Sequence, residues 1–324
     1  MEDVKVIIDT DPGTDDCAAI THFLTHTNVI AITTVFGNIS LDTASNNACR
    51  ILNHLGYDHV PVYTGAHCKL AGVNLQAAGA GDIIHGADGL NNTDVVPQKV
   101  DKFPEEDKSG PAAIIDLVKK YPGEIVLVAI GPLTNIAIAS KLCPEFPKLL
   151  KAMYIMGGST YKGNVTPWAE FNFHCDPLAA HVSLQHLCKD TLVHLVPWET
   201  CLENRLDFPT FHNIFKDCET PAGLLLKSTA MTGYQKDSEE KGEGYCFADQ
   251  FISLTFLHPE SVLRKECYDT AQVNTNAGDA KYGLAEYIRV NDVVAAKNKG
   301  LVVYTKYDMK MMAKLFVNAI KMVR

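Results

Sequence analysis

The stretch KVIIDTDPGTDDCAAI, residues 5–20, decides the fold. A short run of β-branched residues passes through Pro12 and Gly13 into a segment with helical periodicity. This pattern predicts a buried strand over residues 4–8 and a helix over residues 14–25. Polar residues follow directly after the strand, at the carboxyl end where open parallel sheets hold their ligands.

The same order of strand, polar turn and helix returns along the chain. Further strands are predicted at residues 29–35, 125–130, 151–156 and 192–196, with helices over residues 41–55 and from Thr134 onward. Asp176-Pro177 indicates a helix start, with the aspartate as N-cap and the proline at the first helical position. Strands that alternate with helices predict an α/β fold with a mostly parallel central sheet flanked by helices, open and Rossmann-like.

The chain contains no linker and no internal repeat, so we expect a single domain over residues 1–324. Two stretches near residues 68–106 and 218–245 are rich in glycine and polar residues, and the second contains the charged run QKDSEEKGEG. Segments of that length without regular structure are uncommon inside a compact domain unless they serve function. We therefore predict two mobile loops there.

Composition excludes several kinds of partner. The net charge is -9 and the basic residues are not clustered, which excludes nucleic acid as a partner because phosphate binding needs clustered Lys and Arg. No apolar run approaches the roughly 18 residues of a membrane helix, and the first residues do not resemble a cationic leader. The ten cysteines are scattered without a CxxC pair, which indicates reduced thiols and a cytoplasmic location.

The turn after the first strand carries four aspartates within eight positions, Asp9, Asp11, Asp15 and Asp16. Like charges that close raise one another's pKa unless a cation neutralises them, and hard oxygen ligands suit Ca²⁺ or Mg²⁺. Helix capping is an alternative that explains one or two of them. A second alternative is a Mg²⁺-dependent phosphatase of the haloacid dehalogenase type, whose motif DxDx[T/V] also follows a hydrophobic strand. Gly13 occupies the Thr or Val position of that motif, which weakens this alternative.

Other polar clusters also follow the predicted strands. FGN ends at Asn38, GPLTN ends at Asn135, and MGG begins at Met156. Because the carboxyl ends of parallel strands lie at one edge of a sheet, these segments are expected to converge on one crevice. Asn38 alone is equally well explained as a turn residue that tolerates positive φ.

With these blocks in order, the chain resembles the inosine-uridine-preferring nucleoside hydrolase family from its first strand to its C-terminal helix. The resemblance rests on the blocks DTDPGTDD at 9–16, TTVFGN at 33–38, IHGADGL at 84–90, GPLTNIA at 131–137, and MGG followed by GNVTPWAEFNFHCDP, which ends at Pro177. It implies calcium-dependent hydrolysis of the N-glycosidic bond of ribonucleosides to ribose and free base. It also implies a homodimer or homotetramer.

The resemblance assigns residues to roles. It implies Ca²⁺ binding by Asp11, Asp16, Asp249 and the backbone carbonyl of Thr134, with Asp11 as the catalytic base. It implies a ribose pocket formed by Asp15, Asn38, Met156, Asn164, Glu170 and Asn172, with Asp15 and Asn172 near the 2′- and 3′-hydroxyls. It places His85 and Tyr234 near the base. Glu170 and Asn172, two positions apart, are expected to point to the same side of an extended segment.

Two blocks depart from the family pattern. Many members carry a histidine before the last metal aspartate, thought to protonate the leaving base, but this chain reads CFADQF with Ala248 at that place and Gln250 after the aspartate. The candidates to replace the histidine are His85, Tyr234, His174, Cys175, Cys246 and Trp198. The second departure is PWETCLENR at 197–205, where relatives read close to LDVTH; this loop is expected to border the base pocket, so the sequence leaves the base preference open.

The loss of the histidine leaves a further alternative to the enzyme. The chain fits a catalytically silent protein that binds ribose or a nucleoside, and, at the least specific level, an interaction scaffold that binds neither.

Overall fold

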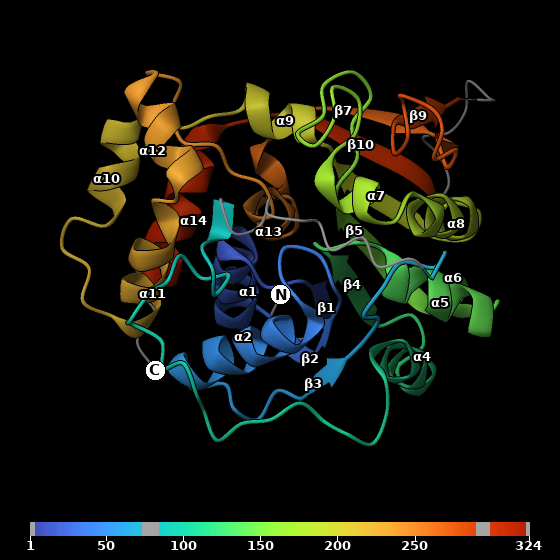
Figure 1. The fold of residues 1–324 in the computed structure, drawn as a ribbon, viewed down its shortest axis with the longest axis horizontal. Helices are drawn as coiled ribbons and strands as arrows, with labels where there is room; N and C mark the ends of the chain where they lie inside the picture. The colour runs from blue at the N-terminus through green and yellow to red at the C-terminus, as the bar shows by residue number, and fades with distance from the viewer. Residues whose placement is uncertain (1–3, 73–83, 290–298, 322–324) are drawn as a thin grey trace.

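The computed structural model describes residues 4–72, 84–289 and 299–321 (Figure 1). An eight-stranded sheet runs through this part of the chain in the order β3-β2-β1-β4-β5-β6-β10-β7. Neighbouring strands pair in parallel except β10 with β7, which pair antiparallel. The strands are β1 Lys5–Thr10, β2 Asn28–Thr34, β3 Val62–Thr64, β4 Ile125–Ala129, β5 Leu150–Met156, β6 Leu192–Val196, β7 Val262–Tyr268 and β10 Gly300–Tyr307. A separate hairpin pairs β8 Thr270–Val273 with β9 Ala285–Ile288.

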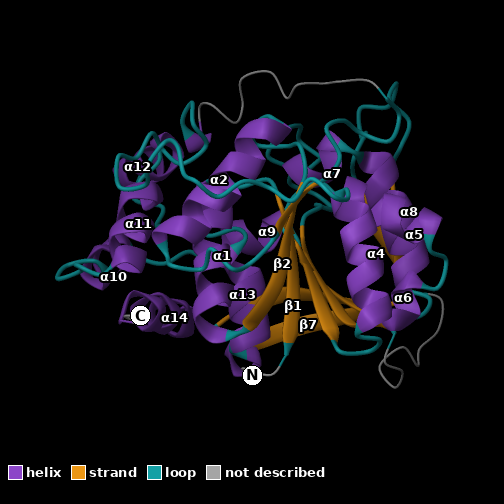
Figure 2. Ribbon diagram, turned by 90° about the horizontal axis from the view of Figure 1, so that it is seen from below, coloured by secondary structure: helices purple, strands orange, loops and turns teal. Residues whose placement is uncertain are grey.

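Helices cover both faces of the twisted sheet (Figure 2). One layer holds α4 Gly110–Lys120, α5 Thr134–Leu142, α6 Phe146–Leu149 and α8 Pro177–Leu187. The other holds α1 Thr14–His26, α2 Leu41–His54, α10 Phe208–Ile214, α11 Pro221–Ala230, α12 Gly233–Glu240, α13 Gln250–Leu257 and α14 Met309–Lys321. Two short helices, α7 Phe171–Cys175 and α9 Trp198–Glu203, follow the carboxyl ends of β5 and β6. The predicted α/β fold with a mostly parallel central sheet between helices is confirmed.

The order of the strands explains where a ligand binds. From β1 the chain winds outward through β2 and β3, and then returns to start again on the other side of β1 with β4, β5 and β6. The winding direction reverses between β1 and β4, and in open α/β sheets such a switch point opens a crevice at the carboxyl ends of the strands. The aspartate turn after β1 and the GPLTN block after β4 therefore begin side by side.

The central strands have the composition that burial on two faces demands. All five residues of β4, IVLVA, are buried, and in β1 only Lys5 is partly exposed. The predicted strands and helices of the first two thirds agree with the structure to within one or two residues. Asp176 caps α8 as predicted, because its carboxylate accepts a hydrogen bond from the backbone N–H of Ala179 at 3.0 Å.

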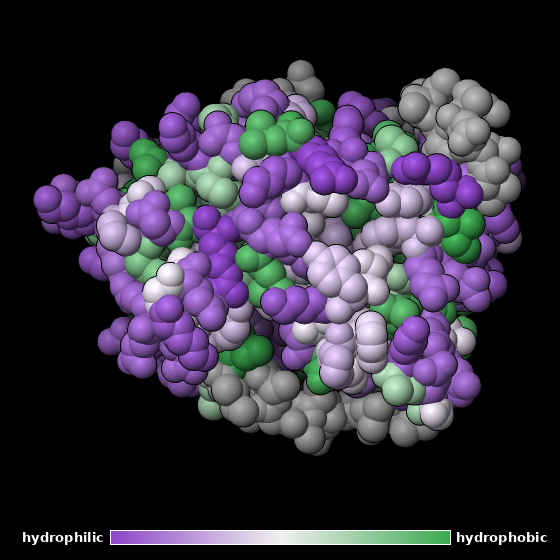
Figure 3. Space-filling view, turned by 90° about the horizontal axis from the view of Figure 1, so that it is seen from above, coloured by the Kyte–Doolittle hydropathy of each residue, from purple (hydrophilic) through white to green (hydrophobic). Residues whose placement is uncertain are grey.

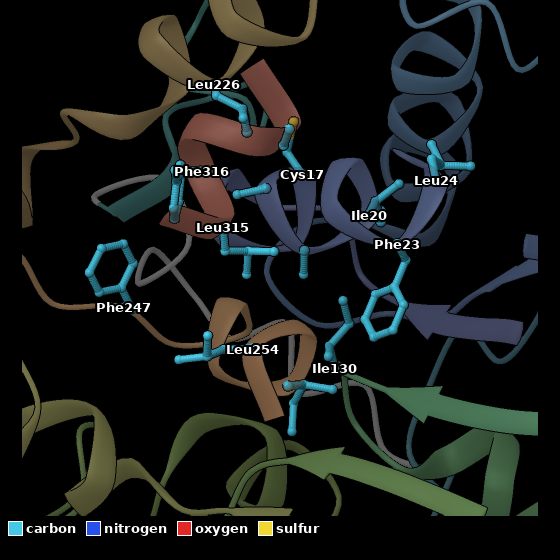
Figure 4. Packing of buried hydrophobic residues seen from close by; sticks show 14 of the residues in the cluster. Cys17, Ile20, Phe23, Leu24, Ile130, Leu226, Phe247, Leu254, Leu315 and Phe316 are labelled. Carbon is cyan, nitrogen blue, oxygen red and sulfur yellow. The ribbon is translucent and has the colours of Figure 1, made fainter. Parts of the chain in front are cut away.

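One hydrophobic core lies on each side of the sheet. The larger joins β1 and β4 to α1, α11, α13 and α14, and Figure 4 shows Phe23, Phe247 and Phe316 turned into it. Phe316 on α14 packs edge-on to the ring of His22 at 4.6 Å and against Phe247 at 5.5 Å. Helices α11, α13 and α14 pack in this way against the first helix of the chain, and α10 packs on α14.

Two predictions about segments need correction or completion. The stretch 218–245 is not an irregular loop, since it folds into α11 and α12; its mobility stays a prediction. The stretch 68–106 consists mainly of turns where it is described, and residues 73–83 lie outside the described part. Glu170 and Asn172 do not share one side of an extended segment, because Glu170 is the N-cap of α7 and Asn172 lies in its first turn.

The surface is mixed. On the face that carries α9, α12 and the β8–β9 hairpin, hydrophobic residues form small groups among hydrophilic ones (Figure 3). In the described residues we find no helix with the length and apolar character needed to cross a membrane. All ten cysteines are free thiols, and seven of them are buried.

Replacing Phe316 by Ala tests the packing of α14. The ring is 2% exposed, so its removal leaves a cavity between α1, α10 and α14 and should lower the free energy of unfolding by about 3–5 kcal/mol. Urea denaturation followed by circular dichroism measures this, with Leu263→Ala on β7, 63% exposed, as the control that should change it by less than about 0.5 kcal/mol. A loss of similar size in both variants would contradict the packing described here.

Candidate active site

The four aspartates of the first turn divide into structural and available groups. Asp9, still inside β1, accepts hydrogen bonds from the hydroxyl of Thr33 at 2.5 Å and from the side-chain amide of Asn135 at 2.7 Å. These bonds tie β1 to β2 and to α5. Asp9 therefore ties the sheet together below the site. Of the remaining three aspartates, Asp15 lines the pocket described below, and Asp11 and Asp16 are buried next to it in sequence.

Asp11 sits in a cradle that only glycine permits. A Cβ atom added at Gly37 would overlap the Asp11 carboxylate, and one at Gly131 would lie 2.6 Å from its Oδ1. The Oδ2 atom of Asp11 accepts the backbone N–H of Asn38 at 2.7 Å, whereas its buried Oδ1 has no hydrogen-bond partner. Burial and the charges of Asp16 and Asp15 raise the pKa of Asp11 well above its usual value. One oxygen of a fully buried carboxylate is thus left available for a ligand.

Asp15, Asp16 and Asp249 converge on one point. Their carboxylate oxygens lie within 4.8 Å of one another, a spacing that suits a metal ion. Burial raises the pKa of Asp15 and of Asp16 to about 6 and that of Asp249 well above its usual value, with the neighbouring aspartates adding to the shift of Asp249. Asp15 also has a buried Oδ1 without a partner.

Capping accounts for only one member of this cluster. Asp16 accepts the backbone N–H of Gly13 at 3.0 Å and the hydroxyl of Thr10 at 2.5 Å, so it does close the first turn of α1. Asp249 precedes α13 but makes no capping hydrogen bond with its side chain. The capping alternative therefore explains Asp16 and does not explain the placement of Asp11, Asp15 and Asp249.

The predicted metal ligands are placed as follows. Asp16 and Asp249 belong to the cluster as predicted, but its third member is Asp15 and not Asp11. Asp11 lies close enough for its charge to raise the pKa of Asp249. Thr134 is the first residue of α5, and its hydroxyl donates to Asp176 at 2.8 Å. Buried carboxylates with unpartnered oxygens fit a hard divalent cation, since such a cation supplies the charge and the ligands they lack.

A pocket of about 350 Å³ opens above the cluster at the carboxyl ends of the strands. Its lining includes all six residues predicted for the ribose, together with Asp249, His85 and Tyr234. Asp11, Asp16 and Thr134 do not line it and are almost fully buried. Of the sequence blocks that were expected to converge on one crevice, DTDPGTDD, FGN and MGG contribute to this lining and GPLTN does not.

Hydrogen bonds fix the orientation of the two asparagines next to the cluster. The amide nitrogen of Asn172 donates to the carbonyls of Ile130 and Met156, at 3.1 and 3.2 Å. That of Asn38 donates to the carbonyl of Asp11 and to Asp16, at 3.3 and 3.1 Å. With both nitrogen atoms occupied, each side chain keeps its amide oxygen as an acceptor for a ligand hydroxyl.

Glu170 is held just as firmly. Its Oε1 accepts the backbone N–H of Asn172 at 2.7 Å, and its Oε2 accepts those of Gly158 and Phe173 at 2.7 and 3.1 Å. Burial nevertheless raises its pKa to about 7. Glu170 therefore offers the pocket an oxygen at the edge of a network that joins β5 to α7.

His85 reaches the pocket beside Asp15. Its Nδ1 accepts the backbone N–H of Thr14 at 3.2 Å, which assigns the ring proton to Nε2. Burial lowers the pKa of His85 to about 4, so the ring is neutral at pH 7. It is a hydrogen-bond donor through Nε2, not a cationic acid.

The structure sorts the candidates for the missing histidine. His85, Tyr234, Cys246 and Trp198 line the pocket, while His174 and Cys175 on α7 do not; the ring of His174 packs edge-on to Tyr282 at 5.7 Å. The lining also contains polar residues that the sequence did not single out, Thr14, Thr232, Gln235 and Tyr245. A signal existed for two of them, because Thr232 and Gln235 have the spacing of a capping box at the start of α12.

Comparison with known proteins gives this arrangement its family. The family model described as inosine-uridine preferring nucleoside hydrolase matches residues 6–314. The chain belongs to this family. Its members depend on a metal ion, in agreement with the acidic cluster among the described residues.

Individual relatives support the assignment. The inosine-uridine preferring nucleoside hydrolase of Leishmania major is 38% identical over 268 residues, which cover 81% of each chain. Probable uridine nucleosidase 2 of Arabidopsis thaliana is 42% identical over 182 residues. That match covers 55% of each chain, so the chain spans about half the length of the first curated relatives it matches.

Two solved structures share the fold over almost the whole chain. A plant nucleoside hydrolase, PpNRh1, superposes with a TM-score of 0.87 at 28% identity and covers 99% of this chain and 100% of its own. A purine-preferring ribonucleoside hydrolase from Gardnerella vaginalis gives 0.86 at 28% identity, with 98% of each chain covered. The fold of this nucleoside hydrolase family member is therefore the fold of the family.

The buried carboxylates predict how pH and a divalent cation act together on stability. The pKa values of Asp15 and Asp16 in the folded protein, about 6, exceed the unfolded value of 3.8. The metal-free fold therefore loses stability as the pH rises from about 4 through 6, because ionisation is easier in the unfolded chain. A bound cation removes this penalty, so the stabilisation by added Ca²⁺ or Mg²⁺ should be larger at pH 7.5 than at pH 5.

Melting temperatures of chelator-treated protein, with and without the cation at both pH values, measure this difference. At a hundredfold excess over the dissociation constant the cation should contribute about 2.7 kcal/mol. Buried histidines far from the cluster, such as His22 and His194, affect the melting curves with and without the cation equally, so their contribution cancels. Equal shifts at the two pH values, or none, would exclude a cation held by these carboxylates.

Proposed function

We propose that the protein is a calcium-dependent ribonucleoside hydrolase that cleaves the N-glycosidic bond to release ribose and a free base. One observation carries this proposal. The carboxylates of Asp15, Asp16 and Asp249, with oxygens within 4.8 Å of one another, lie beside a pocket whose walls hold every residue predicted to bind ribose, in a chain of the nucleoside hydrolase family. Each part of the pocket has a separate task in that reaction.

The floor of the pocket is suited to calcium. We assign the ion to Asp11, Asp16 and Asp249 with the carbonyl of Thr134, next to Asp15. Oxygen donors in this number, most of them ionised, favour Ca²⁺ over softer metals. When bound, the ion would hold the vicinal hydroxyls of the ribose and lower the pKa of a water molecule.

The walls bind the sugar. The carboxylate of Asp15 accepts hydrogen bonds from ribose hydroxyls, and the amide oxygen of Asn172, whose nitrogen is already occupied, accepts one more. We assign these two residues to the 2′- and 3′-hydroxyls. The rest of the sugar is assigned to Asn38, Met156, Asn164 and Glu170, all of which line the pocket.

The carboxylates also favour the bond-breaking step. As the C1′–N bond breaks, its electron pair goes to the base and positive charge develops on the ribose, as in other glycoside cleavages. Negative groups placed in advance around the sugar stabilise that charge. The unpartnered Oδ1 of Asp11 is the base that accepts a proton from water as the oxygen adds to C1′.

Help for the leaving base comes from neutral donors. Ala248 supplies no acid, and the ring of His85 is neutral, so Nε2–H of His85 and the hydroxyl of Tyr234 are the donors assigned to the base. The absence of a cationic acid is the one observation that favours a second candidate function, a protein that binds nucleosides without cleaving them. The phosphatase alternative has no such support, since no Lys or Arg lines the described pocket.

The oligomer and the compartment remain predictions of the resemblance and the composition. We expect a homodimer or homotetramer in the cytoplasm, and size-exclusion chromatography with light scattering determines the first.

A substrate screen tests the proposed function. Purine and pyrimidine ribonucleosides are incubated with the protein, and free base is measured by chromatography with and without EDTA. We expect base release that EDTA abolishes and added Ca²⁺ restores. Binding without base release in calorimetry would establish the silent alternative, and release that EDTA does not affect would contradict the role of the metal.

Asp11 and Asp249 provide the matched mutational test. Asp11→Ala removes both a metal ligand and the base, and Asp249→Ala removes the ligand from α13; each should lower kcat at least about 10³-fold, in the range seen when a catalytic group and its electrostatic partner are lost. Asp116→Ala, an exposed aspartate on α4, is the control. Turnover that survives in both site variants would remove the mechanism.

A further inference from the structure

Residues 197–205, the segment that differs from the family pattern, meet helix α12 at one side of the pocket. At its start the segment puts Trp198 into the lining, and at its end Arg205 reaches α12. The guanidinium of Arg205 donates to the hydroxyl of Ser238 at 2.7 Å, to Glu243 at 2.8 Å and to the hydroxyl of Tyr234 at 3.3 Å. Tyr234 lines the pocket, so Arg205 touches the site through this one side chain.

Backbone contacts hold this arrangement in a fixed frame. Leu206 and Tyr245 form a β-bridge with hydrogen bonds in both directions, at 3.1 and 2.7 Å. The side chain of Gln235 donates to the carbonyl of Cys246 at 2.6 Å and accepts its N–H at 3.1 Å. These contacts hold α12, and with it Tyr234, against residues 245–246.

The hydrogen bond from Arg205 leaves the Tyr234 proton available, because a guanidinium can only donate. Arg205 has only donors, so the Tyr234 oxygen accepts and its own O–H points away from the guanidinium. The thiol of Cys246, which also lines the pocket, is a hydrogen-bonding neighbour of the Tyr234 hydroxyl, and its own S–H is directed to the carbonyl of Cys201 at 3.4 Å. The Tyr234 proton is thus not used by Arg205 and can be donated to another acceptor, such as an oxygen or nitrogen of a base in the pocket.

Charge adds to orientation. Arg205 is 16% exposed, and its positive potential reaches both Tyr234 and Cys246, where it lowers the pKa of each against the effect of burial. The described lining of the pocket holds no arginine or lysine, so Arg205 brings its charge to the site from behind Tyr234. A base that leaves with the electron pair of the C1′–N bond gains negative charge, which a nearby cation stabilises.

We propose that Arg205 is a positioning residue that turns the Tyr234 hydroxyl toward the leaving base and stabilises the negative charge that grows there. This proposal rests on the hydrolase function proposed above. Tyr234 donates a hydrogen bond to the departing base and keeps its proton, while water supplies the oxygen at C1′. The base leaves as an anion with the electron pair of the C1′–N bond and takes its proton from solvent. Arg205 and Tyr234 thus assist the leaving base without a titrating acid, a role for which Ala248 offers no side chain.

A comparison of two leaving groups tests it. Uridine needs a hydrogen bond to its leaving base, whereas p-nitrophenyl β-D-ribofuranoside releases a phenolate that is stable without one. Arg205→Gln and Tyr234→Phe should each lower kcat for uridine by about 10- to 100-fold and change kcat for the nitrophenyl riboside by less than about 3-fold. The double variant should be no more than about 3-fold worse than Tyr234→Phe alone, because both changes remove one interaction.

Controls separate this role from a structural one. Arg264→Gln, a surface arginine 69% exposed and paired with Glu266, should change neither substrate. Arg205→Lys keeps the aliphatic stem and the charge, and should lower kcat for uridine by at least about 3-fold without lowering kcat for the nitrophenyl riboside. This variant keeps the test valid if Arg205→Gln does not fold. Equal losses on both substrates, or losses that multiply in the double variant, would overturn the proposal.

The wild-type protein distinguishes this proposal from the function on which it rests. If wild type cleaves both substrates, the function stands and the variants alone decide the role of Arg205. If wild type binds uridine without cleaving it, calorimetry replaces turnover: Arg205→Gln and Tyr234→Phe should weaken uridine binding non-additively and leave ribose binding unchanged. Wild type that neither binds nor cleaves uridine overturns both.

Discussion

Repulsion between buried carboxylates is the constraint on which the rest of this structure depends. Asp11, Asp15, Asp16 and Asp249 come from two distant parts of the chain and lie together. Asp15 is partly exposed and the other three are almost fully buried, and two of the oxygens have no hydrogen-bond partner. A folded protein holds such an arrangement only when something compensates the charge. A divalent cation does so, and the same charge then serves a sugar that becomes positive as its base departs.

The sheet makes this arrangement possible by its topology. The switch point between β1 and β4 opens the crevice, and glycines on both sides let the backbone close around Asp11. Asn38 and Asn172 are fixed by their own nitrogen atoms, which leaves acceptors in the pocket for hydroxyl groups. A polyol bound above a cation is the ligand that this pattern of acceptors fits best.

Most of the fold could be predicted from the sequence because its signals are local. The run from β1 through the aspartate turn into α1 combines hydrophobic periodicity, a Pro-Gly turn and a helix start within sixteen residues. A similar order of signals returns at β2, β4 and β5. The partners within the site were less accessible. Asp249 is 238 positions from Asp11, so only the resemblance to a family, and not spacing, suggested that they meet.

Other features were missed for physical reasons. The charged run in 218–245 indicated a loop, although Thr232 and Gln235 begin a helix whose polar face is solvated and whose Tyr234 faces the pocket. The contact of Arg205 with Tyr234 depends on how two segments 29 positions apart dock, which no local pattern encodes. Glu170 was assigned to extended structure because two-residue spacing does not distinguish a strand from a capped helix start.

Crystals grown with calcium and measured for anomalous scattering test the central claim most directly. The account predicts one strong peak at the pocket floor, with oxygens of Asp11, Asp16 and Asp249 and the carbonyl of Thr134 at about 2.3–2.6 Å from it. A peak elsewhere, or a floor in which these carboxylates turn away from one another and bind no ion at saturating calcium, would contradict it.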